Sequence, residues 1–376
     1  MKIILYGGAF NPVHREHVAL ARAAVRRYSP DKLIVIPTAV SPHKSGYMLA
    51  GDGDRLAMLK EAFADMPCAE VSDFELKSGG VSYSYITCRH FKEVYPDAEI
   101  YFLMGADMLA SFDKWKYPEK ILSCVSLIAG ARENGADFLK YKTDVEKNFS
   151  TIVNCVDYVG DKVSSTKIRV LAALGEDISA YVLPCTRQYI EGQGLYSLKN
   201  IAQAKLYEKP SRWAHSVRVA VMCAQNASRV GWTEKQAIIA GALHDVAKNL
   251  DVSSPLLKGF VAPDGVPQPV LHQFAGEYVA RTHFAIEDES ILNAIKYHCS
   301  GRPAMTETEM LLYLCDMLEE AHNFDGIENL RKEFSSDIKK GMLAALEHQV
   351  KYLNSVGGEI YNSTEQAYLY LKENLT

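Results

Sequence analysis

Apolar residues in the first half of the chain form short runs that alternate with segments of helical periodicity. Runs of strand length, rich in valine, isoleucine and leucine, lie at 2–8, 31–38, 69–76, 98–106, 125–131 and 151–159. Segments with an apolar residue every three or four positions lie between several of them, at 17–28, 54–66 and 84–95. Strands that alternate with helices need crossover connections, so the pattern predicts a mostly parallel sheet with helices on both faces. Ligands of such sheets bind beyond the carboxyl ends of the strands.

The pattern changes after about residue 196. Amphipathic helical segments follow at 201–209, 212–231, 233–250, 272–284, 289–298 and 307–324, and a long tail continues the pattern. The segment GFVAPDGVPQPV (259–270) is rich in glycine and proline and predicts a loop. A chain of 376 residues exceeds one ordinary core. We therefore expect an α/β Rossmann-like domain over 1–196 and an all-α domain over 197–376.

Composition narrows the classes of partner. The net charge of −5 argues against nucleic acid or an anionic membrane surface as the main partner. The chain has eight cysteines, none in a C-x-x-C pair, which is typical of free thiols in a reducing compartment. No stretch approaches the roughly 20 apolar residues of a membrane span. We expect a soluble, cytoplasmic protein that binds small molecules, and a homo-oligomer is compatible with this sequence.

The first candidate site is the segment GGAFNPVHREH (7–17), where the first predicted strand opens into a loop. Gly7 and Gly8 let the backbone approach a ligand closely, and the following helix N-terminus favours anions. His14 and His17 are three residues apart at the loop–helix junction. Two imidazoles there could hydrogen-bond a polyphosphate and stabilise the charge of a leaving pyrophosphate. The alternative is that His14 packs within the loop and His17 caps the helix.

Polar residues also follow other predicted strands. PTAVSPHK (37–44) ends in Lys44, MGADML (104–109) contains Asp107, and SSTKIR (164–169) places hydroxyls and Arg169 at a helix start. Hydroxyls and cations at a helix start can form an anion site. Taken singly, such charged residues are usually solvated. Their shared position after strands favours one ligand site at one edge of the sheet.

GGAFNPVHREH resembles the H-x-G-H signature of the nucleotidyltransferase superfamily. Together with PTAVSPHK, MGADMLASFDKW, VSSTKIR and YIEGQGLY, it resembles bacterial nicotinate-mononucleotide adenylyltransferases. The resemblance implies transfer of AMP from ATP, with Mg²⁺, to nicotinate mononucleotide, giving nicotinate adenine dinucleotide and pyrophosphate. One departure is Glu16, which stands where the family usually has glycine.

The same resemblance assigns roles to residues of this domain. It implies phosphate contacts or catalysis by His14, His17, Lys44, Ser165, Thr166 and Arg169. It implies nucleotide contacts by Gly7, Gly8, Ala9, Phe10, Gly105 and Asp107. It implies a nicotinate pocket of Ser82, Tyr83, Ser84 and Trp115. An alternative keeps the transferase fold with another acceptor, such as phosphopantetheine, against which the predicted nicotinate pocket argues.

The second candidate site lies in the helical half. His244 and Asp245 end an apolar helical run in GALHDVAKNL, and Asp316 lies within MLLYLCDML. A buried carboxylate is unfavourable without a cation, so carboxylates on two apolar helices, with histidines on others, indicate a metal centre. Adjacent helical residues diverge by about 100°, so the His244–Asp245 pair could ligate one metal ion or bridge two.

This half resembles the HD phosphohydrolase superfamily in His215, His244–Asp245 and Asp316. The segments RWAHSVRVA, AGALHDVAK, HQFAGEYVA, AIKYHCSGRPAM and LCDMLEEAHNFDGIENLR resemble the HD-type symmetrical diadenosine tetraphosphate hydrolases. Members of that group cut the dinucleotide to two ADP and use iron.

The resemblance implies a dinuclear iron site and catalytic roles for Asp245 and Lys248, with Arg302 as a phosphate contact. The implied metal ligands are His215, His244, Asp245, His272, His298 and Asp316. Together the halves predict a bifunctional enzyme. The alternatives for the helical half are a nucleotide sensor that binds without cutting, or a phosphohydrolase of mononucleotides or cyclic dinucleotides.

Overall fold

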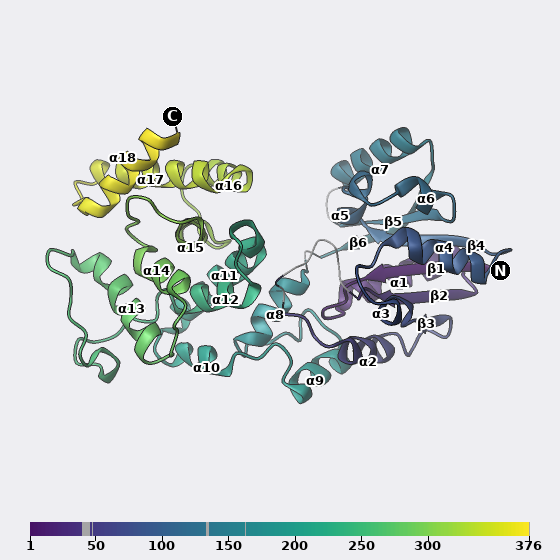
Figure 1. Cartoon of the computed structure of the whole chain (residues 1–376), viewed down its shortest axis with the longest axis horizontal. Coiled ribbons are helices and arrows are strands. Elements are labelled where there is room, and N and C mark those ends of the chain that lie inside the picture. Colours follow the sequence, from purple (N-terminus) through teal and green to yellow (C-terminus); the bar gives the residue numbers. More distant parts are fainter. Residues whose placement is uncertain (40–45, 47, 133–134, 162, 376) are drawn as a thin grey trace. The chain divides into compact units, whose positions relative to one another are not determined.

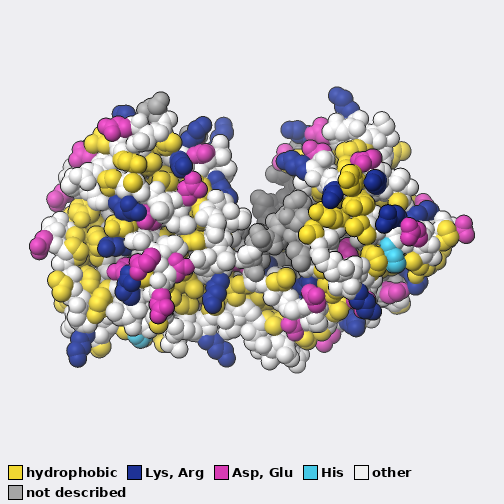
Figure 2. Space-filling model, viewed as in Figure 1, with side chains coloured by type: hydrophobic (Ala, Val, Ile, Leu, Met, Phe, Trp, Pro, Cys, Tyr) yellow, Lys and Arg dark blue, Asp and Glu magenta, His cyan; other side chains and the backbone are white. Residues whose placement is uncertain are grey.

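The computed structural model describes residues 1–39, 46, 48–132, 135–161 and 163–375, and only the backbone at 131, 132, 135, 136 and 159. The chain divides into two compact units. The N-terminal unit consists of Met1–Ser45, Leu49–Arg169 and Asp177–Tyr196. The C-terminal unit consists of Gly46–Met48, Val170–Glu176 and Ser197–Thr376. Figure 2 shows basic and acidic side chains interspersed over the visible face of each unit.

Within the described residues, six strands of the N-terminal unit form one sheet in the order β3-β2-β1-β4-β5-β6. The strands are β1 (Lys2–Gly8), β2 (Lys32–Pro37), β3 (Ala69–Val71), β4 (Glu99–Gly105), β5 (Ser126–Arg132) and β6 (Val153–Gly160). Every neighbouring pair is parallel, which confirms the predicted parallel sheet. The order reverses between β1 and β4, which is the switch point where open parallel sheets bind ligands.

Helices lie on both sides of this sheet (Figure 1). The helices between residues 1 and 196 are α1 (Arg15–Tyr28), α2 (Asp52–Ala62), α3 (Phe74–Ser78), α4 (Ser84–Val94), α5 (Ala106–Leu109), η1 (Phe112–Lys114), α6 (Pro118–Leu122), α7 (Gly135–Phe149), α8 (Ser165–Ala173) and α9 (Pro184–Gln193). Ile3, Ile4 and Leu5 of β1 are all fully buried although neighbouring side chains point to opposite faces. Coverage of both faces explains why the strands read as continuous apolar runs.

The strand predicted over 69–76 is wrong beyond Val71, because Phe74–Ser78 forms the short helix α3. The Ser72 hydroxyl accepts a hydrogen bond from the Phe74 amide (3.3 Å), and the Asp73 carbonyl accepts one from Lys77 (2.9 Å). β3 is an edge strand with one neighbour, so these local bonds replace few ladder bonds.

The described part of the C-terminal unit contains helices and no strand, which confirms the predicted all-α fold. The helices are α10 (Lys199–Ala202), η2 (Gln203–Leu206), α11 (Pro210–Asn226), η3 (Ala227–Val230), α12 (Glu234–Leu243), η4 (Pro255–Leu257), η5 (Gln268–Val270), α13 (Leu271–Thr282), α14 (Glu289–Tyr297), α15 (Glu307–Leu318), α16 (Ile327–Ser336), α17 (Ile338–Ser355) and α18 (Asn362–Leu375). Among the described residues, none of the helices has both the length and the apolar character needed to cross a membrane.

Two helices end earlier than the apolar pattern predicts. The predicted helix 233–250 ends at Leu243, and the predicted helix 307–324 ends at Leu318. After Leu243 the chain continues in tight turns, with the Val246 amide bonded to the Leu243 carbonyl (3.2 Å) and the Lys248 amide to the Asp245 carbonyl (2.8 Å). The C-terminal ends of these two helices therefore lie next to polar residues whose side chains point into the C-terminal unit.

Candidate functional site

The loop after β1 is held in place by hydrogen bonds from distant segments. Phe10 has a left-handed backbone (φ 45°), and its ring lies over Gly8, where a Cβ would be 3.1 Å from the ring. A side chain at position 8 would push this ring away, which explains the glycine. The buried Asn11 side-chain oxygen accepts hydrogen bonds from the Ala50 amide (3.0 Å) and the Tyr196 hydroxyl (2.7 Å).

His14 and His17 stack against each other at the start of α1, with ring centroids 3.6 Å apart. The backbone N–H of His14 donates to His17 Nδ1 (3.2 Å). Because Nδ1 accepts this bond, the proton of the neutral His17 ring is assigned to Nε2. In addition to this structural contact, the Nε2–H group of His17 is available to donate a hydrogen bond at the helix N-terminus.

Glu16 turns toward the end of β6. Its carboxylate accepts hydrogen bonds from the Tyr158 hydroxyl and from the Asp161 amide (3.0 Å). A Cβ at Gly160 would collide with both Glu16 and Tyr158, so glycine is needed where these side chains meet. Glu16, which stands where the family usually has glycine, therefore has hydrogen-bond partners in this chain.

The start of α8 is tied to the same loop. Ser165 Oγ donates to the Pro12 carbonyl (3.3 Å), and Arg169 Nη1 donates to the Asn11 carbonyl (2.6 Å). Arg169 Nη2 also donates to Thr166 Oγ1 (3.0 Å), and the arginine is only 3% exposed. The structure thus brings both predicted anion segments together, with Arg169 supporting the loop carbonyl.

The predicted nicotinate residues lie at the N-terminus of α4 and after η1. Trp115 packs against Phe102, with ring centroids 6.0 Å apart, and is half-buried. Lys116 Nζ lies 4.3 Å from the centre of the Tyr83 ring, which brings the two segments side by side. Asp107 follows β4, and its carboxylate folds back over Gly105. Lys44 lies outside the described residues.

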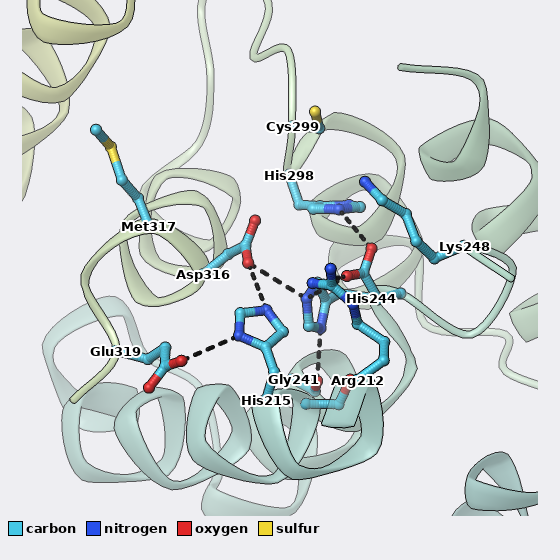
Figure 3. Close-up of polar contacts among 12 residues, drawn as sticks. Arg212, His215, Gly241, His244, Lys248, His298, Cys299, Asp316, Met317 and Glu319 are labelled. Carbon is cyan, nitrogen blue, oxygen red and sulfur yellow. Dashed lines mark hydrogen bonds and ion pairs between the residues drawn. The ribbon is translucent and has the colours of Figure 1, made fainter. Parts of the chain in front are cut away.

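In the C-terminal unit, the six predicted metal ligands converge from five helical segments. Figure 3 labels four of them, His215, His244, His298 and Asp316, which point toward one another. His215 lies on α11, His272 on α13 and Asp316 on α15, whereas His244–Asp245 and His298 follow the ends of α12 and α14. Five of the six are buried, and the Asp316 side chain is half-buried.

Backbone carbonyls orient three of the histidine rings. The Nδ1 atoms of His244, His272 and His298 donate to carbonyls three residues earlier, at 2.8, 2.9 and 2.7 Å respectively. A proton on Nδ1 leaves the lone pair of Nε2 free, which is the form that ligates a metal ion. The three Nε2 atoms point toward the cluster.

The two carboxylates face these nitrogen atoms. Asp316 Oδ1 lies 2.8 Å from His215 Nε2 and 3.5 Å from His244 Nε2. Asp245 Oδ2 lies 3.6 Å from His244 Nε2. One group of ligand atoms therefore comes from His215, His244, Asp245 and Asp316.

Asp245 also faces a second group through its other oxygen. Its Oδ1 lies 3.3 Å from His272 Nε2 and 3.6 Å from His298 Nε2, and these two nitrogens are 3.2 Å apart. The buried atoms His244 Nε2 and Asp245 Oδ1 make no hydrogen bond of good geometry in the described part of the chain. Facing lone pairs and orphaned buried atoms need a cation, so the residues fit a metal ion.

The charge balance of the cluster agrees with this fit. Burial works against a charge on His244, but Asp245 and Asp316 outweigh it and raise the pKa of His244 to about 10. Burial and the neighbouring His298 lower the pKa of His272 to about 3. The carboxylates thus attract positive charge into a site whose ligands are mostly buried.

Two cationic side chains reach the cluster from its rim. Lys248 Nζ lies 3.0 Å from His272 Nε2. Arg212 Nη1 lies 2.9 Å from Asp245 Oδ2, and its side chain is 36% exposed. Sequence reasoning missed Arg212, although its place one helical turn before His215 puts both on one face of α11. Arg302, predicted as a phosphate contact, is paired with the buried Glu309 (2.8 Å).

Sequence reasoning also missed Glu319, which is fully buried behind His215. Its Oε1 lies 3.2 Å from His215 Nδ1, and Arg218 pairs with both carboxylate oxygens at 2.7 and 3.0 Å. A carboxylate behind a ligating histidine fixes the ring and raises its basicity. The ring of His322 also lies close, 5.3 Å from that of His215.

Two families match this chain. Residues 5–171 match the cytidylyltransferase-like family, and residues 212–321 match the HD domain. The chain is 32% identical over 324 residues to the probable nicotinate-nucleotide adenylyltransferase/Ap4A hydrolase of Mycoplasma pneumoniae, covering 84% of this chain and 88% of that protein. A protein of the same name in Mycoplasma genitalium is 29% identical over 359 residues, which is 92% of this chain and 97% of the relative.

Solved structures include a predicted HD superfamily hydrolase from Clostridium acetobutylicum, described as involved in NAD metabolism. It is 29% identical, with a TM-score of 0.44, over 47% of this chain and 96% of that one.

Proposed function

Because this chain belongs to the nicotinate-nucleotide adenylyltransferase/Ap4A hydrolase family, we propose that it is a bifunctional enzyme. The N-terminal unit transfers the adenylyl group of ATP to nicotinate mononucleotide, forming nicotinate adenine dinucleotide and pyrophosphate. The C-terminal unit hydrolyses diadenosine tetraphosphate to two ADP. The buried cluster of four histidines and two aspartates is the single observation that best supports the second activity. Both substrates are nucleotides and the cysteines are free thiols, so we place the enzyme in the cytoplasm.

In the N-terminal unit, the phosphate of nicotinate mononucleotide attacks the α-phosphorus of ATP, which is bound with Mg²⁺. A phosphorus–oxygen bond forms, and the bond to the leaving pyrophosphate breaks on the opposite side. The Nε2–H group of His17 donates to the pyrophosphate as its charge grows. The unit supplies position and hydrogen bonds, so the reaction needs no protein nucleophile.

Other groups of the N-terminal unit bind the two nucleotides. The loop Gly7–Phe10 contacts the adenosine, Asp107 contacts a ribose, and His14, Lys44, Ser165, Thr166 and Arg169 support or bind the phosphates. The turn Ser82–Ser84 holds the nicotinate carboxylate through backbone N–H groups, and Trp115 stacks on the pyridine ring. A helix N-terminus suits this carboxylate because its amides carry partial positive charge.

In the C-terminal unit, the six ligands would hold two iron ions, and Asp245 faces both groups of ligand atoms with its two oxygens. Bound metal ions would supply Lewis acidity to the phosphate oxygens and activate a water molecule. Glu319 orients His215 from behind. Arg212 and Lys248 lie at the rim, where their charges can bind the remaining phosphates of the substrate.

The N-terminal activity is tested by incubating the full chain with ATP, Mg²⁺ and nicotinate mononucleotide and separating the products. Nicotinate adenine dinucleotide and pyrophosphate in equal amounts support the proposal. Phosphopantetheine, offered in the same assay, is the comparison acceptor. If the enzyme adenylylates phosphopantetheine and not nicotinate mononucleotide, phosphopantetheine is the acceptor substrate.

The C-terminal activity is tested on the full chain purified without oxygen and supplied with ferrous iron. Two ADP per diadenosine tetraphosphate require attack on a central phosphorus and support the symmetrical reaction. ATP plus AMP would mean attack at an outer phosphorus. Metal bound without any turnover would make this unit a nucleotide sensor or an enzyme for another phosphate ester.

A further inference from the structure

A buried carboxyl group lies beside the proposed nicotinate pocket and has no part in the chemistry described above. Glu75, on α3, is 7% exposed, and its Oε1 accepts a hydrogen bond from Thr87 Oγ1 of α4 at 2.5 Å. No lysine, arginine or histidine among the described residues forms an ion pair with it. A carboxyl group is rarely buried without a cation, so its position calls for another reason.

Glu75 and Thr87 flank the segment that carries the turn Ser82–Ser84. Gly79 and Gly80 enter this segment with left-handed backbones (φ 65° and 71°), and a Cβ at either would touch nothing within 4 Å. The segment therefore begins with two conformationally free residues that make little packing contact. A hydrogen bond between its flanking helices restricts the positions that the turn can take.

The Ser82 side chain lies near the same carboxyl group. Burial raises the pKa of Glu75, while the hydrogen bond from Thr87 and the neighbouring Ser82 side chain lower it. The other carboxylate oxygen of Glu75, Oε2, is buried and makes no hydrogen bond within the described part of the chain. Ser82 Oγ also accepts a hydrogen bond from the Ala39 amide (3.0 Å), which lies just beyond β2. The turn is thus held from two sides, by the hydrogen bond from Thr87 of α4 to Glu75 of α3 and by the hydrogen bond from the Ala39 amide to Ser82 beyond the end of β2.

We propose that Glu75 is a positioning residue that sets the specificity for the acceptor nucleotide. By holding Thr87 in the first turn of α4, it keeps the backbone N–H groups of the Ser82–Ser84 turn aimed at the carboxylate of the pyridine ring. A carboxylate accepts these bonds with both oxygens, whereas a carboxamide brings its own N–H donors against them. This inference rests on the proposed adenylyl transfer to nicotinate mononucleotide.

The test compares steady-state kinetics of the full chain with nicotinate and nicotinamide mononucleotides at saturating ATP. Glu75→Ala should raise the KM for nicotinate mononucleotide about tenfold or more, because small displacements at a binding site have large kinetic effects. The preference for nicotinate over nicotinamide mononucleotide, as a ratio of kcat/KM, should fall by a similar factor. The kcat and the KM for ATP should stay within about twofold of wild type.

Two further variants separate positioning from loss of structure. Glu75→Gln keeps an oxygen that accepts the hydrogen bond from Thr87, so it should restore KM to within about threefold of wild type. Glu93→Ala, at an exposed residue of α4, is the matched control and should change neither KM nor preference. Hydrolysis of diadenosine tetraphosphate by the same samples reports whether the other unit is intact.

Glu75→Ala with unchanged KM and unchanged preference would overturn the inference, as would an equal loss of kcat for both acceptors. If Glu75→Ala does not fold, Thr87→Val removes the same hydrogen bond from its other end and should shift KM and preference in the same direction. A wild-type chain that makes no nicotinate adenine dinucleotide would instead overturn the proposed function.

Discussion

The histidines of the two units differ in what their Nδ1 atoms face. In the N-terminal loop, Nδ1 of His17 accepts a bond from a backbone N–H group. In the helical unit, Nδ1 of His244 and His298 donates to backbone carbonyls. The first arrangement leaves an N–H donor on Nε2, and the second leaves a lone pair there. The same side chain is thus prepared for an anion in one unit and for a metal ion in the other.

The surroundings of the two sites follow this difference. The loop site uses imidazole rings, backbone amides and a helix N-terminus, with the guanidinium of Arg169 buried behind the loop. The helical site buries Asp245 among histidines, where a carboxylate is stable only with positive charge nearby. Substitutions should therefore act more severely in the helical site than in the loop.

The largest effect is expected from Asp245→Ala. Asp245 faces both groups of ligand atoms, so its loss should remove metal and lower hydrolysis of diadenosine tetraphosphate by about 1,000-fold or more. Metal content per chain and hydrolysis rates check this. Adenylyl transfer should be unchanged, and loss of both activities would contradict independent sites.

His17→Ala should lower adenylyl transfer by roughly 100- to 1,000-fold, the range for removing one preorganised donor to a developing charge. Its hydrolysis rate should equal that of wild type. His90→Ala, at a half-buried histidine stacked on Phe74 in the same unit, is the matched control. A His17→Ala enzyme with normal kcat would assign His17 to packing alone.

Glu208→Gln tests how much the burial of an ionisable carboxyl group beside the metal-ligand cluster lowers the free energy of unfolding. Burial raises the pKa of Glu208 from 4.5 to about 7, although Ser216 donates a hydrogen bond to it (2.8 Å). A raised folded-state pKa means that stability is fully present below about pH 4.5 and is lost as pH rises through 7. Metal-depleted Glu208→Gln should match wild type near pH 5 and be more stable at pH 8, by up to about 3 kcal/mol.

Denaturant unfolding of metal-depleted wild type and Glu208→Gln at pH 5 and pH 8 measures this difference. A constant difference in the free energy of unfolding across this range would show that Glu208 keeps one charge state throughout.

Arg212→Ala should lower hydrolysis about 10- to 100-fold while metal content stays near that of wild type, because Arg212 lies at the rim and not among the ligands. Arg229→Ala, at another arginine of the same unit, provides the comparison for lost charge. If Arg212→Ala loses metal instead, the arginine acts by orienting Asp245.

The smallest effect is expected from Glu16→Gly, which introduces the residue usual in the family. The carboxylate already has partners in Tyr158 and the Asp161 amide, so its removal should not raise kcat for adenylyl transfer by more than about twofold. The free energy of unfolding should fall by about 1 kcal/mol, from the lost hydrogen bonds and the helical glycine. A tenfold rise in kcat would show that the carboxylate repels the triphosphate.

The sequence by itself determined the layers of both units and the residues that the helical site brings together. Continuous apolar runs indicated strands buried on both faces, and Asp245 and Asp316 stood out because carboxylates in apolar helices need a cation. The end of β3 was mispredicted because two hydrogen bonds at Ser72 and Asp73 outweigh a short apolar run.

Only the tertiary structure decided the partners that orient these residues. His215 meets Asp316 and Glu319 about a hundred positions along the chain, Glu16 meets Tyr158 on β6, and Glu75 meets Thr87 across a turn. The direction of a side chain and the tautomer of a histidine depend on which group packs against them. Such contacts have no period or spacing in the sequence, so they become visible only when the helices and strands are packed.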